Sequence, residues 1–109
     1  MEGSSPRQFA RTELDTPVDI QIGKQTIRIA SPSNNVSVGG LFVRRDDLKV
    51  GMPVHITIPV NSHSFEADGR VDTVSRAGSG IEFRSLSAAE LENLYELIAD
   101  LTIRGQAAA

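Results

Sequence analysis

The sequence of 109 residues contains no cysteine and no tryptophan. The lack of cysteine excludes a disulfide framework, a thiolate nucleophile and a zinc–thiolate site. No apolar run approaches the length that a bilayer requires, and the first residues show neither the basic start nor the apolar stretch of a signal peptide. The length suits a single domain. We therefore expect one small cytoplasmic domain without membrane insertion.

Residues typical of catalytic and metal sites are also scarce. The alternation of apolar residues places His55 on the outer face of a strand, and His63 lies in a polar turn. A metal site needs three or four convergent ligands, and neither histidine has that spacing. The sequence contains no nucleophile elbow, zinc-protease motif or P-loop. We expect no enzyme activity, no metal and no cofactor.

The charge balance is slightly acidic, with a formal net charge of −3. General binding of nucleic acid needs a broad basic face that releases counterions. Sites for single-stranded nucleic acid add stacking aromatic residues, and this chain has four Phe and one Tyr. A small barrel that binds single-stranded nucleic acid is therefore disfavoured, whereas a small anion held by a local cluster of cations is compatible with the charge.

Short runs of alternating apolar residues, separated by turn residues, predict a mainly β protein. The spacing indicates a small antiparallel β-barrel of about six strands. The predicted strands lie near residues 18–22, 27–29, 41–43, 54–60, 65–71 and 81–83.

The C-terminal region predicts one amphipathic helix over residues 87–103. Ser87 and Glu90 have the spacing of a capping box, which satisfies free N–H groups at the start of a helix. Apolar residues from Leu91 to Leu101 then recur at helical spacing and form one stripe for packing on the barrel. We expect Gly105 to end the helix and residues 105–109 to form a disordered tail.

Two polar motifs lie outside the apolar pattern. Arg7 and Arg11 lie four residues apart in segment 1–11, which we expect to be a flexible arm. Each guanidinium can form paired hydrogen bonds with a phosphate or with the O6/N7 edge of guanine. The run 35–40 reads Asn-Val-Ser-Val-Gly-Gly and combines compact polar side chains with a glycine pair that lets a ring approach the backbone. Together they predict a site for a flat, doubly charged anion.

The two motifs in this order resemble the PilZ domain, a bacterial receptor for cyclic di-GMP. The last strand, Gly80-Ile81-Glu82-Phe83, and the helix after it extend the resemblance over roughly residues 6–102. The resemblance implies a PilZ-like split barrel over residues 12–104. It also implies ligand contacts from the motif residues Arg7, Arg11, Asn35, Ser37, Gly39 and Gly40, with Arg76 in the loop before the last strand as a further candidate.

The resemblance implies a second-messenger receptor of the kind that controls motility and biofilm formation. Ligand binding would order the N-terminal arm and relay the signal to an effector protein in trans, from a monomer or a weak homodimer. Many family members carry an additional Arg where this chain has Pro6, so the number of ligand molecules bound stays open. The alternative is a PilZ-like interaction module that binds no nucleotide and serves in pilus or motility assembly.

Overall fold

The computed structural model describes residues 11–30, 34–60 and 63–108, and within them it contains eight strands and one helix. No helix of this part of the chain combines the length and the apolar character that crossing a bilayer requires. The elements in chain order are β1 Thr12–Glu13, β2 Val18–Ile22, β3 Gln25–Ile29, β4 Asn35–Val36, β5 Gly40–Val43, β6 Pro53–Val60, β7 His63–Ser75, β8 Gly78–Arg84 and α1 Ala88–Ala108.

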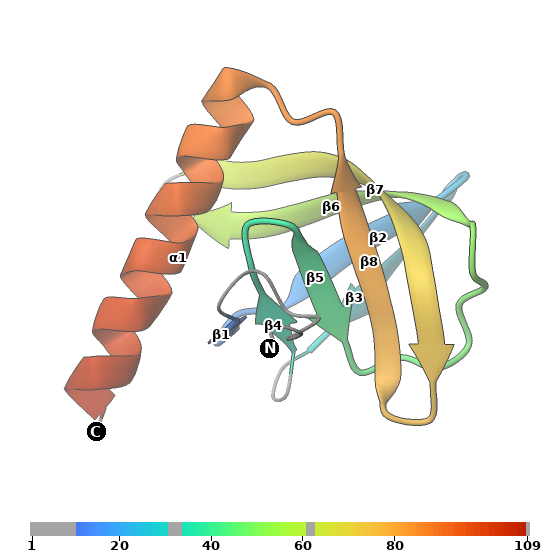
Figure 1. Cartoon of the computed structure of the whole chain (residues 1–109), viewed down its shortest axis with the longest axis horizontal. Helices are drawn as coiled ribbons and strands as arrows, with labels where there is room; N and C mark the ends of the chain where they lie inside the picture. The colour runs from blue at the N-terminus through green and yellow to red at the C-terminus, as the bar shows by residue number, and fades with distance from the viewer. Residues whose placement is uncertain (1–10, 31–33, 61–62, 109) are drawn as a thin grey trace, which may run out of the picture.

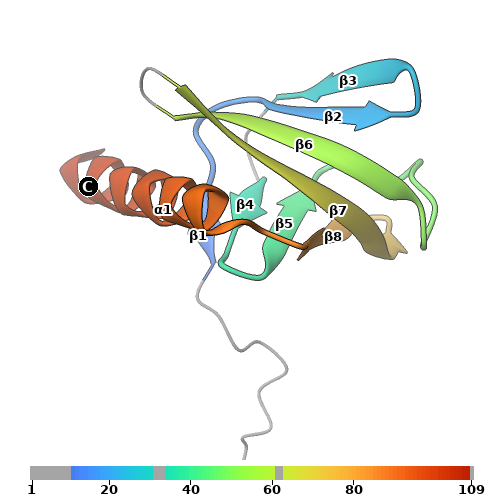
Figure 2. The same ribbon diagram turned by 90° about the horizontal axis from the view of Figure 1, so that it is seen from above.

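All eight strands form one antiparallel sheet in the order β1-β4-β5-β8-β7-β6-β2-β3. The sheet curls on itself, and α1 lies across one end (Figure 1). In the view of Figure 2, β2 and β3 lie above β4 and β5. The predicted class, a mainly β barrel-like fold with a C-terminal helix, is confirmed. The strand count was too low because β1 and β4 have two residues each, too few for alternation to be visible in the sequence.

The core lies on the inner face of the curled sheet. Val54, Ile56, Ile58 and Val60 of β6 are all buried, as period-2 alternation requires. Strand β7 alternates in the same way, and Phe65 is one of its buried residues. The ring of Phe65 packs edge to face against the ring of Phe83, with the ring centroids 5.3 Å apart. Strand β7 is longer than predicted: it runs for 13 residues from His63, which lies in the strand and not in the predicted turn.

The helix packs its apolar stripe on this core through Leu94, Leu97 and Leu101, which are buried. The backbone N–H of Glu90 donates to Ser87 Oγ at 3.1 Å, so half of the predicted capping box is present. The Glu90 carboxylate instead accepts a hydrogen bond from the backbone N–H of Glu66 at 2.9 Å. The first turn of α1 is thereby joined to β7.

The predicted end of the helix is corrected by the structure. Helix α1 passes through Gly105 and continues to Ala108, so the segment predicted as a tail is helical as far as that residue. Glycine within a helix costs about 1 kcal/mol relative to alanine, and the residues after it, Gln-Ala-Ala, are good helix formers. A single glycine is therefore not enough to end this helix.

Leu94→Ala should lower the free energy of unfolding by about 2–5 kcal/mol, because it leaves a cavity between α1 and the sheet. Tyr95→Ala is the matched control, since the neighbouring side chain is 53% exposed and such substitutions usually change stability by less than about 0.5 kcal/mol. Urea denaturation of both variants measures the difference. Equal losses for the two would contradict the assignment of the buried face.

Candidate functional site

Pairing of β1 with β4 brings the two sequence motifs together. Thr12 lies opposite Val36, and Glu13 lies opposite Asn35. Arg11 directly precedes β1, and its Nη1 donates a hydrogen bond to Asn35 Oδ1 at 2.9 Å. One arginine of the first motif and the asparagine of the second, 24 positions apart, therefore share one exposed edge of the sheet.

The neighbour of Asn35 has a different role. Asn34 is completely buried, and its Oδ1 accepts a hydrogen bond from the backbone N–H of Arg44 at 2.9 Å. Its Nδ2 donates to the carbonyl oxygens of Ile29 and Ala30, both at 3.4 Å. Buried amides need such partners. The Asn34 side chain thus connects the start of β4 to the end of β3 and to Arg44, the residue after β5.

The rest of the second motif forms the turn between β4 and β5. The backbone N–H of Ser37 donates to the Gly40 carbonyl oxygen at 2.8 Å, and the buried Ser37 Oγ accepts from the Gly39 N–H at 3.3 Å. A Cβ atom at position 40 would collide with the backbone carbonyl oxygen of Ile81 on β8. Ser37 and Gly40 therefore hold the turn that positions Asn35, and a ligand ring near the glycine pair stays a prediction.

Of the remaining predicted ligand residues outside the second motif, the structure describes Arg76 and not Arg7. Arg7, with the rest of the arm up to residue 10, lies outside the described residues. Arg76 lies exposed in the turn between β7 and β8, and β5 separates that hairpin from β4. The described contacts thus bring together Arg11 and Asn35, with Ser37, Gly39 and Gly40 in the supporting turn.

The chain that follows β1 is tied to the far end of the helix. Arg104 Nε and Nη2 donate to the two carboxylate oxygens of Asp15 at 2.6 and 2.9 Å. The hydrogen bonds from Arg104 hold the pKa of Asp15 below its usual value, and the same contact raises the pKa of Arg104. The backbone N–H of Leu14 donates to the Asn34 carbonyl oxygen at 2.9 Å. Strand β1 and the residues directly after it therefore contact both β4 and α1.

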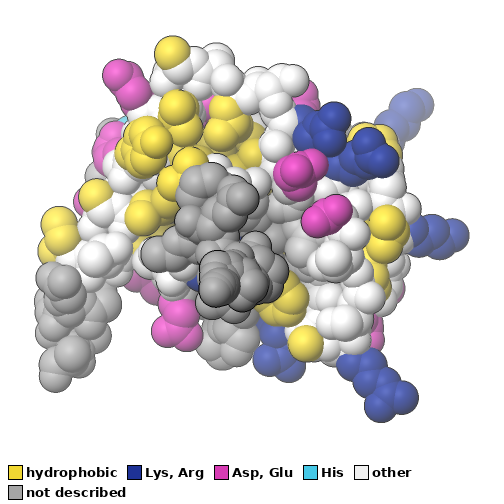
Figure 3. Space-filling view, in the orientation of Figure 1, with side chains coloured by type: hydrophobic (Ala, Val, Ile, Leu, Met, Phe, Trp, Pro, Cys, Tyr) yellow, Lys and Arg dark blue, Asp and Glu magenta, His cyan; other side chains and the backbone are white. Residues whose placement is uncertain are grey.

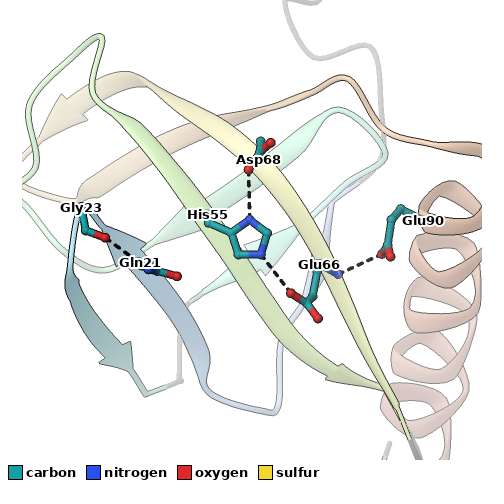
Figure 4. Close-up of polar contacts among 6 residues, drawn as sticks. All are labelled: Gln21, Gly23, His55, Glu66, Asp68 and Glu90. Atoms are coloured by element: carbon teal, nitrogen blue, oxygen red, sulfur yellow. Dashed lines mark hydrogen bonds and ion pairs between the residues drawn. The ribbon is translucent and has the colours of Figure 1, made fainter.

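A second polar cluster lies on the outer face of β6 and β7 (Figure 4). His55 Nδ1 lies 3.0 Å from Asp68 Oδ1, and His55 Nε2 lies 2.9 Å from Glu66 Oε1. Hydrogen bonds with Asp68 first, and then with Glu66, raise the pKa of His55 above 6.5. The predicted outer-face position of His55 is confirmed, and sequence reasoning missed its two carboxylate partners.

In the part of the chain that the structure describes, no group of three or more His, Asp and Glu side chains is arranged to hold a metal ion. In the space-filling view, hydrophobic side chains gather over the upper half of α1, whereas Lys and Arg lie mainly toward the opposite side (Figure 3). The described surface thus has no continuous basic stripe on this face.

The family model described as PilZ domain matches residues 5–100. A search of curated proteins found no match.

Solved structures share the fold. The PilZ domain of YcgR from Escherichia coli, solved with c-di-GMP, superposes with a TM-score of 0.73 over 95% of this chain and 97% of that chain, at 16% identity. The Bacillus subtilis inhibitor of motility MotI/DgrA gives 0.69 at 21% identity, covering 92% of this chain and 52% of that one. The PilZ domain of CeSA from a cellulose-synthesizing bacterium gives 0.67 at 15% identity, over 85% and 98%.

The adjacent asparagines offer a matched pair of substitutions. Asn34→Ala should lower the free energy of unfolding by about 1–3 kcal/mol, since it removes a buried side chain and leaves the part-buried Arg44 N–H without its acceptor. Asn35→Ala should change stability by less than about 0.5 kcal/mol, because its side chain is at the surface. Chemical denaturation of the two variants distinguishes them. A larger loss for Asn35→Ala would refute this division of roles.

Stability should depend on pH through His55. Its raised pKa means that the folded state binds the proton more tightly, so the stabilisation is fully present below about pH 6.5 and is lost as pH rises through the folded-state pKa. Because the side chains are well exposed, the effect should not exceed about 1 kcal/mol. Melting curves of the parent and His55→Gln at pH 5.5 and 8.5 should differ only at the lower pH.

The control for this titration keeps the histidine and removes its partners. The double variant Glu66→Gln, Asp68→Asn leaves His55 without a carboxylate at its ring nitrogens. Its melting temperature should lack the extra stabilisation at pH 5.5. If the double variant retains the full pH dependence of the parent, another group is responsible.

Proposed function

This chain belongs to the PilZ domain family, and on that premise we propose that it is a receptor for cyclic di-GMP that acts by binding and not by catalysis. The observation that carries the proposal is the contact between Arg11 and Asn35. Two polar groups from distant parts of the sequence meet at one exposed edge, and both have the hydrogen-bonding groups that a guanine or a phosphate requires.

The partner of Arg11 distinguishes it from other arginines. Within the described residues, Arg11 bonds a neutral amide, whereas the guanidinium groups of Arg28, Arg45 and Arg104 form ion pairs with carboxylates. An arginine held by an amide keeps its positive charge uncompensated by that partner. It can exchange one neutral hydrogen bond for a stronger, charge-assisted bond to phosphate.

The comparisons support this ligand. The E. coli YcgR domain that shares the fold was solved with c-di-GMP. We propose that Arg7 and Arg11 bind guanine edges and phosphates, and that Asn35 bonds a guanine from the opposite side. Ser37, Gly39 and Gly40 act mainly by holding the turn beneath it. Arg76 is retained as a peripheral contact, reached only by a ligand that extends past β5.

We propose that the signal passes from the site to α1 through β1. Arg11 lies at one end of this segment and the Asp15–Arg104 ion pair at the other. Ligand binding that orders the arm would alter the surface near the end of the helix, and an effector protein in trans would bind this altered surface. We place this receptor in the cytoplasm and in the control of motility or biofilm formation, and the fold of a motility inhibitor among the neighbours supports that setting.

The second candidate function is a PilZ-like module for pilus or motility assembly that binds no nucleotide. The observation in its favour is that Ser37 and Gly40 have structural roles of their own. The presence of these two motif residues is therefore not by itself evidence for ligand binding. Isothermal titration with cyclic di-GMP, with GTP as the control, separates the two. Binding of the first and not of the second supports the receptor, and binding of neither supports the assembly module.

Arg11→Ala should weaken cyclic di-GMP binding by about 1.5–3 kcal/mol, which is roughly ten- to a hundredfold or more, because a charge-assisted contact is lost. Arg7→Ala should have a similar effect. Arg28→Ala is the control, since Arg28 is exposed and paired with Asp19 on β2. Titration calorimetry of the three variants should show full affinity only for the control. Parental affinity in both Arg7→Ala and Arg11→Ala would refute the assignment.

A further inference from the structure

The register of the sheet places an aromatic ring next to the Arg11–Asn35 pair. Phe42 on β5 lies directly opposite Asn35 on β4. Its neighbours Leu41 and Val43 are both buried in the core, so Phe42 is directed to the outer face, where it is only partly buried. Asn35 lies on the same outer face, because Val36 beside it is buried.

Two glycines leave the surface beside this ring without side chains. On β8, Gly80 lies opposite Phe42 and presents only backbone. A Cβ atom at Gly78, two residues before it, would lie 2.7 Å from Phe42 Cζ and 3.0 Å from Cε2, so the ring rests against the Gly78 backbone. Beyond Gly80 comes the exposed Thr73 of β7. Asn35, Phe42, Gly80 and Thr73 therefore form one row across four strands, which we term the outer row.

The outer row is suited to one face of a flat ring. Glycine at positions 78 and 80 removes the side chains that would otherwise stand above the neighbouring backbone. Of the other described aromatic residues, Phe65 and Phe83 pack against each other in the core and Tyr95 lies on α1. Among described residues, Phe42 is thus the aromatic side chain that the outer face of the sheet presents.

We propose that Phe42 is the stacking platform for a guanine base of the ligand, with Arg11 and Asn35 at the edge of that base. This inference rests on the proposed function and adds a residue that lies just after the second sequence motif and belongs to neither motif. Stacking binds the π-face of a base and hydrogen bonds bind its edge, so the two types of contact are complementary. Phe42 would favour planar heterocycles over simple phosphates at this site.

Phe42→Leu tests the platform because leucine retains apolar bulk but loses the ring. Loss of an aromatic stacking partner should weaken cyclic di-GMP binding about five- to a hundredfold, with the melting temperature close to that of the parent. Phe42→Tyr keeps the ring and should bind within about twofold of the parent, since stacking depends on the π-face. Titration calorimetry gives both affinities.

Fluorescence supplies a direct readout, since the chain contains no tryptophan. Phe42→Trp introduces a single indole at the platform, and its emission should change strongly and saturably when cyclic di-GMP is added. Thr57→Trp is the matched control on the outer face of β6, opposite Glu66 of β7. Its emission should be unaffected by the ligand.

The outcomes separate this inference from the proposed function. Absence of cyclic di-GMP binding by the parent chain would refute both. Binding by the parent, weakened in Arg11→Ala but unchanged in Phe42→Leu, would refute the platform alone. Equal fluorescence responses from Phe42→Trp and Thr57→Trp would also refute it, because the response would then not be local to the outer row.

Discussion

The close approach of β5 to β8 at Gly40 is the constraint on which the site depends. No side chain fits there, because a Cβ atom would collide with the Ile81 carbonyl oxygen. With β5 held this close, the turn formed by Ser37 and Gly40 closes through its own hydrogen bonds and sets the direction of β4. Asn35 then points outward beside Arg11. A packing requirement in the sheet thus determines the position of a surface amide.

The site has little charge of its own, and its chemistry is local. A chain with a net charge of −3 cannot attract polyanions by a general field. A guanidinium bonded to an amide still offers a discrete positive charge at a defined point. Such an arrangement favours a compact anion over an extended one, because selectivity comes from geometry and not from total charge.

The sequence predicted the parts of the fold whose periodicity is long enough to detect. The strand with Val54 and Ile56 and the helix with Leu94 were predictable because burial recurs at a fixed interval. The two-residue strands β1 and β4 were not, although they bring the motifs together. The two motifs predicted that Arg11 and Asn35 contact one ligand, but not the direct hydrogen bond between them. The structural role of Asn34 and the position of Phe42 beside Asn35 depend on cross-strand register, which a single sequence does not specify.

The Asp15–Arg104 ion pair joins residues 89 positions apart. Closing so long a loop costs about 4 kcal/mol of chain entropy, which is more than one exposed ion pair supplies. We therefore expect the junction of β1 with α1 to form late in folding, after the hairpins built from local contacts. Arg11 reaches its place beside Asn35 through this same segment. If the proposed site is correct, only molecules in which the whole chain has folded would bind the ligand, and partly folded molecules would not.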